Sequence, residues 1–144
     1  MKEDVLEQVV DDYLKFSGPA TGLYIDQFRE APAVFKYQGR YFLITSHCAG
    51  WAPSMALYAV APSMLGPWKE MGNPMVGPGA DKTFNAQGTY VLPVAGRPGA
   101  FIFIADRWEP ENLPDSRYIW LPIGIQGDKL EIPWRDQWNL SVFK

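Results

Sequence analysis

The fold of this chain is decided by residues 29–46, which read REAPAVFKYQGRYFLITS. Apolar residues dominate 33–35 and 41–44, and this pattern predicts two β-strands with buried faces. Between the strands, Gln38 and Gly39 are typical of the tight turn of a β-hairpin. A single carboxylate, Glu30, precedes the first strand, so it must point into either solvent or a cavity. Judged from these residues alone, a solvated charge at the strand end is the commoner arrangement.

The composition predicts one domain of short strands and many turns. Of the 144 residues, 47% are hydrophobic and 20% are charged, which is enough apolar material for one core. Thirteen glycines and 13 prolines interrupt the chain often. The formal net charge of −3 comes without a basic cluster, which argues against nucleic acid or an anionic membrane as a partner. The lone Cys48 excludes an internal disulfide, and no apolar run is as long as a membrane span.

The strands group into two repeat-like units. In the first unit, residues 63–70 read SMLGPWKE, where Gly66 and Pro67 break the third strand and Trp68 covers its edge. Each unit runs to about 50 residues, a period typical of blade-type repeats. The strands predicted for the two units lie at 33–37, 41–46, 55–61, 88–94, 100–105, 117–125 and 130–132.

Three stretches lie outside these strands. Residues 1–16 carry apolar side chains at helical spacing, yet a strand over 12–16 fits equally well and is the one we favour. Residues 72–85 are rich in Gly, Pro, Asn and Asp, which predicts an irregular loop. Residues 134–144 are predicted to hold a terminal strand that needs a partner.

Three motifs, in this order, resemble the family 43 glycoside hydrolases, which are five-bladed β-propellers that cleave arabinosides, xylosides and galactosides. Residues 30–32 (EAP) with the hairpin that follows resemble the segment that carries the general acid. Residues 65–68 (LGPW) resemble the outer edge of a blade, and residues 106–108 (DRW) follow the second strand of the second unit. The resemblance covers nearly all of 30–143.

The resemblance implies an all-β fold that is part of a five-bladed propeller. Closed propellers need roughly four to eight blades, so two units do not close a ring. We therefore predict the end of a preceding blade and a loop over 1–29, blade units over 30–76 and 77–133, and the terminal strand. Such a chain is the C-terminal part of a larger enzyme, and its predicted partner is the missing N-terminal half or another copy of itself.

Two residues receive catalytic roles from the resemblance. Inverting hydrolysis uses two carboxyl groups roughly 6.5–9.5 Å apart, and Glu30 matches the proton donor. The usual aspartate base and the acid that tunes the donor have no counterpart here, so the isolated chain is expected to be catalytically crippled. Gln87 stands where many members carry a metal-binding histidine, and it resembles the exo-β-1,3-galactanase branch, in which a glutamine positions or activates the water. On its residues alone, Gln87 is more often an amide bonded to loop backbone.

Five further residues are candidates for binding sugar. Trp51 and Trp108 offer flat faces to a pyranose, and Arg107 can form paired hydrogen bonds with sugar hydroxyls or clamp Glu30 or Asp106. The plainer alternatives are blade packing for Trp108 and a rim ion pair for Asp106 and Arg107. The only histidine, His47, follows the Glu30 hairpin and is placed in a substrate-side loop by the resemblance.

The predicted function is hydrolysis of β-galactosides, galactan or related plant polysaccharides. The first alternative is a non-catalytic carbohydrate-binding fragment, and the second is a half-propeller whose main property is self-association. The resemblance allows a calcium ion in the propeller channel, but no zinc or calcium motif supports one, so we predict no cofactor. The chain itself does not reveal its location, and the family implies a secreted or periplasmic protein.

Overall fold

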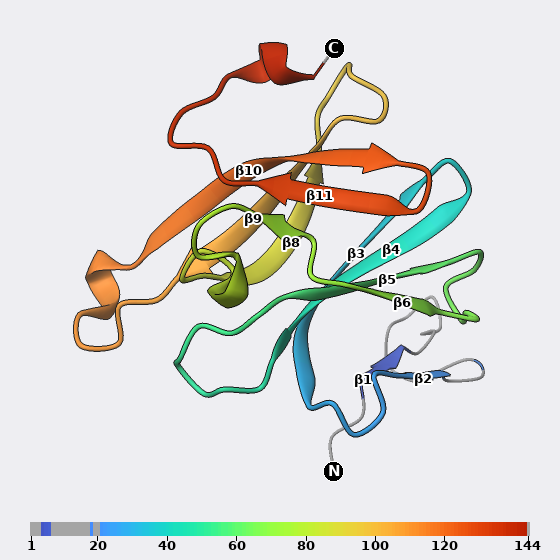
Figure 1. The fold of residues 1–144 in the computed structure, drawn as a ribbon, viewed down its shortest axis with the longest axis horizontal. Coiled ribbons are helices and arrows are strands. Elements are labelled where there is room, and N and C mark those ends of the chain that lie inside the picture. The colour runs from blue at the N-terminus through green and yellow to red at the C-terminus, as the bar shows by residue number, and fades with distance from the viewer. Residues whose placement is uncertain (1–3, 7–17, 19–20, 144) are drawn as a thin grey trace.

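The computed structural model describes residues 4–6, 18 and 21–143, and its described elements are β-strands and short 3₁₀ turns (Figure 1). The all-β fold is therefore confirmed. Near the N-terminus, β1 (Asp4–Leu6) pairs antiparallel with β2 (Thr21–Leu23). The strand predicted over 12–16 lies outside the described residues. The described part contains no helix that is long and apolar enough to cross a membrane.

The first large sheet is an antiparallel meander in the order β3-β4-β5-β6. Gln38 and Gly39 both have positive φ angles, of 46° and 75°, as a two-residue hairpin turn with the right twist requires. The predicted hairpin is confirmed, with both of its strands longer than expected. The four strands are β3 (Arg29–Tyr37), β4 (Arg40–His47), β5 (Leu57–Ala61) and β6 (Lys69–Gly72).

The second large sheet has the order β7-β11-β10-β9-β8. Its last four strands in sequence are β8 (Gln87–Pro93), β9 (Phe101–Arg107), β10 (Arg117–Gln126) and β11 (Lys129–Pro133). The irregular loop predicted over 72–85 is wrong in part, because it contains β7 (Met75–Val76) and the 3₁₀ turn η1 (Ala80–Lys82). Strand β7 forms because the outer edge of β11 has unpaired backbone groups, and the N–H of Ile132 donates to the Pro74 carbonyl.

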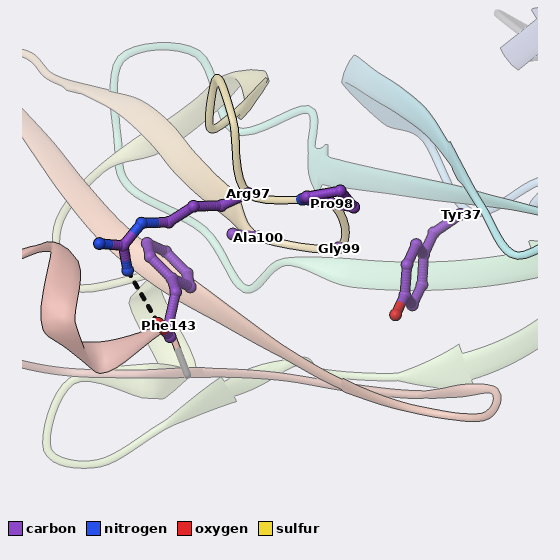
Figure 2. Close-up of a pocket in the computed structure, with 6 residues that line it drawn as sticks. All are labelled: Tyr37, Arg97, Pro98, Gly99, Ala100 and Phe143. Atoms are coloured by element: carbon purple, nitrogen blue, oxygen red, sulfur yellow. Dashed lines mark hydrogen bonds between the residues drawn. The ribbon is translucent and has the colours of Figure 1, made fainter.

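The strand predicted over 134–144 is wrong for its described part, which forms loops and the 3₁₀ turn η3 (Leu140–Val142). The backbone groups there find partners other than a neighbouring strand. Asn139 Oδ1 accepts from the N–H of Ser141, and Arg97 Nη1 donates to the carbonyls of Leu140 and Phe143. Figure 2 shows this arginine pointing toward Phe143, with Tyr37 on the far side of the β8–β9 turn. These residues line a cavity of about 500 Å³.

The core lies between the two large sheets. Phe35 of β3 packs against Phe101 of β9 with their ring centroids 4.9 Å apart, and Phe42 and Phe103 are fully buried. The other face of the first sheet is covered as well, because Leu23 packs in a cluster with Leu43 of β4 and Ala59 of β5. The other face of the second sheet is different, since it exposes three large aromatic side chains. They are Tyr90, Tyr118 and Trp120.

Candidate functional site

A β-bulge places Glu30 where the two large sheets meet. Glu30 lies within β3 and not ahead of it, and its partner in β4 is Ser46. The register shifts between Glu30 and Ala33, where Ala31 has a φ angle of 53°. Pro32 fits this bulge because a bulged residue is not needed as a ladder donor. A bulge re-aims the neighbouring side chains, and here it turns Glu30 toward the second sheet.

Gln87, the first residue of β8, reaches from the second sheet to the first. Its Nε2 donates to Glu30 Oε1 at 2.9 Å and to Ser46 Oγ at 2.9 Å. Glu30 Oε1 and Ser46 Oγ can both accept hydrogen bonds, which is the arrangement that places the nitrogen of the amide toward Glu30. The arrangement also differs from an amide bonded to loop backbone, because both partners are side chains of strand residues. We call Glu30, Ser46 and Gln87 the polar cluster.

The bulge also places His47, which the resemblance assigned to a substrate-side loop, at the end of β4 and outside the polar cluster. In an unbroken hairpin, the pairing of Tyr37 with Arg40 continues to His47 opposite Glu30. The shift of one residue puts Ser46 there instead, and His47 pairs with Arg29. Neighbouring residues of a strand point to opposite faces, so His47 faces away from the cluster. Its ring Nδ1 lies 3.1 Å from the Gln27 carbonyl oxygen.

An open cleft of about 230 Å³ lies beside the polar cluster, with Gln87 in its wall. The loop after β4 supplies Trp51 and the loop after β9 supplies Trp108, and their rings meet edge to face with centroids 5.3 Å apart. Trp51 is 60% exposed and Trp108 is 40% exposed, so both still present surface to solvent. The cleft brings together four residues expected from the sequence, Gln87, Trp51, Arg107 and Trp108. Sequence reasoning missed three polar residues of its wall, Ser54, Asn85 and Glu109.

Arg107 belongs to the wall of the cleft but clamps neither Glu30 nor Asp106. Its Nη2 donates to the Phe84 carbonyl at 2.7 Å, and its guanidinium lies over the Trp134 ring, 5.5 Å from the centroid. The Nε–H group of Arg107 is a buried donor without an acceptor among the described residues.

Asp106 lies next to the polar cluster and outside the wall of the cleft. It pairs with Gln87 across the β8–β9 ladder, and partial burial raises the pKa of its carboxyl group above the ordinary aspartate value. Asp106 and Arg107 form no ion pair with each other, so the rim ion pair considered from the sequence is absent.

Gln87 has no ring nitrogen to offer a metal ion, unlike a histidine at this position. The amide turns its nitrogen toward Glu30, and a nitrogen that carries hydrogens is a donor and not a metal ligand. In the part of the chain that the structure describes, no three His, Cys, Asp or Glu side chains gather in a way that could hold an ion.

The chain was compared with known proteins. No family model and no curated protein matches it. Among solved structures, it is 46% identical to a family 43 β-1,3-galactosidase solved with galactodeoxynojirimycin, with a TM-score of 0.87 over 94% of this chain and 39% of that one. A second family 43 β-1,3-galactosidase is 34% identical, with a TM-score of 0.90 over 96% of this chain and 29% of that one. An exo-β-1,3-galactanase from Clostridium thermocellum is 32% identical, with a TM-score of 0.78 over 89% and 28%. The chain thus spans less than half the length of each.

Proposed function

Because the chain belongs to glycoside hydrolase family 43 and covers part of that propeller fold, we propose that it carries the acid side of a site that hydrolyses β-galactosides or galactan. Glu30 is the proposed general acid. The observation that carries the proposal is the polar cluster, in which a carboxylate at the seam of two sheets is held by an amide from the other sheet.

The contacts of Glu30 suit a proton donor. Its Oε1 accepts from Gln87, while Oε2 receives no hydrogen bond from the described residues. In the proposed step, the proton on Oε2 moves to the glycosidic oxygen as the bond to the leaving group breaks. The carboxylate that remains is stabilised by the N–H group on Oε1.

We propose that Gln87 orients Glu30 and does not activate water from the opposite side of the sugar. An inverting pair needs roughly 6.5–9.5 Å between its groups for the sugar and the water. Gln87 Nε2 lies only 2.9 Å from Glu30 Oε1, which leaves no such gap. In this scheme the group that activates water comes from outside the described residues, and hydrolysis inverts the anomeric centre.

The cleft supports a sugar as the ligand. Pyranose rings stack on aromatic faces, and Trp51 and Trp108 are exposed at the cleft. Arg107 lines the cleft, and a guanidinium carries several N–H donors that suit sugar hydroxyls. The related galactosidase was solved with galactodeoxynojirimycin, and a galactoside is accordingly the ligand that we propose here.

We further propose that the exposed face of β8, β9 and β10 receives the rest of the propeller. Tyr90 and Trp120 both flank Ile104 across the ladders and are 54% and 51% exposed, so an apolar row crosses the sheet. Exposed rows of this kind mark surfaces that another element covers. The chain spans 39% and 29% of two relatives, which leaves further blades to serve as that element. Sedimentation tests this partner, because a stable dimer of the chain would favour self-association instead.

Hydrolysis of an aryl β-galactoside by the chain joined to the rest of the propeller, which supplies the water-activating group, tests the catalytic proposal. General acid catalysis contributes typically 10²–10⁴-fold, so Glu30→Gln should lower kcat by about 100-fold or more. The matched control is Glu70→Gln, the same change at an exposed carboxylate that accepts from Gln27 and lies outside the site. An unchanged rate in Glu30→Gln would defeat the assignment. Galactose binding by that completed propeller, seen as a change in tryptophan fluorescence without any turnover, would favour the non-catalytic alternative.

A further inference from the structure

Ser46 lies at the centre of the polar cluster and was not a candidate from its sequence position. Its side chain is 3% exposed, and its Oγ lies 2.9 Å from Gln87 Nε2 and 3.5 Å from the Glu30 carbonyl oxygen. A serine hydroxyl accepts through its lone pairs and donates one hydrogen. Ser46 can therefore accept from Gln87 while its own hydrogen points to the main chain of Glu30.

We propose that Ser46 is a positioning residue that fixes the amide of Gln87, with the nitrogen toward Glu30 and the carbonyl oxygen Oε1 toward the cleft. The inference rests on the proposed roles of Glu30 and Gln87, and it adds a third residue that acts through them. It also assigns Gln87 Oε1 as an acceptor for a hydroxyl group of the sugar or for water.

One carboxylate alone does not hold a glutamine amide in a single orientation. The terminal torsion of glutamine is broad, and either amide hydrogen could reach Glu30 while the other turned elsewhere. A second acceptor removes this freedom, because Glu30 Oε1 and Ser46 Oγ then take one hydrogen each. Gln87 Oε1 receives no hydrogen bond from any described residue, and Gln87 is part of the cleft wall. The oxygen is thus left available on the side where a ligand enters.

The bulge in β3 is what brings the serine to this place. It moves the partner of Glu30 from His47 to Ser46, so a small buried hydroxyl stands where an imidazole would otherwise stand. A hydroxyl of this size leaves room for Gln87 to cross from the other sheet. Bulge, serine and amide therefore act as one arrangement that sets the orientation of the carboxyl group.

NMR of the Gln87 side-chain NH₂ tests the inference without any turnover. In the 144-residue chain, its two hydrogens should exchange with water more slowly than those of the exposed Gln38 and Gln126. Ser46→Ala should raise the exchange rate of one hydrogen about tenfold, the factor expected for one lost hydrogen bond. Ser46→Thr keeps the hydroxyl and should restore slow exchange. Ser63→Ala is the matched control, because it removes a hydroxyl that bonds the Gly66 carbonyl in a distant turn.

The outcomes separate this inference from the proposed function. Unchanged Gln87 exchange in Ser46→Ala, or equal changes in Ser46→Ala and Ser63→Ala, would overturn the positioning role and leave the test of Glu30 untouched. Faster exchange in Ser46→Thr to the level of Ser46→Ala would also overturn it, since the hydroxyl would then not be the cause. An unchanged rate of hydrolysis in Glu30→Gln would refute the role of Glu30 as general acid, but it would not affect the result of the Gln87 exchange measurement.

Discussion

Replacement of Gln87 by methionine tests whether the polar cluster holds the two large sheets together. The change keeps the size of the side chain but removes both donors, so Glu30 Oε1 and Ser46 Oγ lose their partner. A hydrogen bond to a charged group contributes about 1.5–3 kcal/mol and a neutral one about 1 kcal/mol. Glu30 is only half-buried and water can reach it, so the lower end applies. We expect Gln87→Met to lower the free energy of unfolding by about 2.5 kcal/mol at pH 7.

Urea unfolding followed by tryptophan fluorescence measures this loss. With a slope of about 2 kcal/mol per M, the midpoint should fall by about 1 M. Gln27→Met is the matched control, because Gln27 Nε2 also donates to a carboxylate, at 3.2 Å from Glu70 Oε2, but that pair is exposed. Surface changes of this kind usually stay within about 0.5 kcal/mol. Equal midpoints for the two variants would refute the reasoning that burial gives the cluster its strength.

Two further changes have expected results. Gly99 has a φ angle of 84°, and a Cβ there would lie 2.8 Å from Tyr37 Oη, so Gly99→Ala should lower the free energy of unfolding by about 2–3 kcal/mol. Gly96→Ala has the same backbone cost at φ 72° with open space around it, so urea midpoints should show a smaller loss, of about 1 kcal/mol. Asp106 has a raised pKa in the folded chain, so its ionisation should weaken folding as pH rises from the ordinary aspartate value through the folded one. Asp106→Asn should therefore gain stability relative to the unchanged chain over that range, and a constant difference from pH 3 to pH 7 would contradict this.

The sequence predicted the hairpin well, because Gln38 and Gly39 are a strong local signal and the strands beside them are apolar. It did not predict the bulge, since a bulge depends on how Pro32 and its neighbours pair across the sheet. Without the bulge, the hairpin pairing would put His47 opposite Glu30, so nothing in the sequence singled out Ser46. Trp51 and Trp108 were easier to choose, because exposed aromatic residues in loops need no register.

The parts that were wrong share a physical cause. Strand β7 is only two residues long, and it forms because it pairs with the edge of β11. Two residues are too few for a hydrophobic periodicity within 72–85 to predict it. The segment after β11 has the apolar content of a strand. It forms a turn because Arg97 donates hydrogen bonds to the carbonyls of Leu140 and Phe143. In both cases, contacts with a residue distant in sequence determine the local backbone conformation.

The placement of Glu30 and Gln87 on different sheets has a mechanical consequence. Their 2.9 Å contact spans a seam whose width depends on the fit of rings such as Phe35 against Phe101. A side chain trimmed deep in that seam would let the sheets settle by fractions of an ångström, and the aim of the carboxyl group would drift with them. Interior residues of the seam thus influence how the Glu30 carboxyl group is aligned.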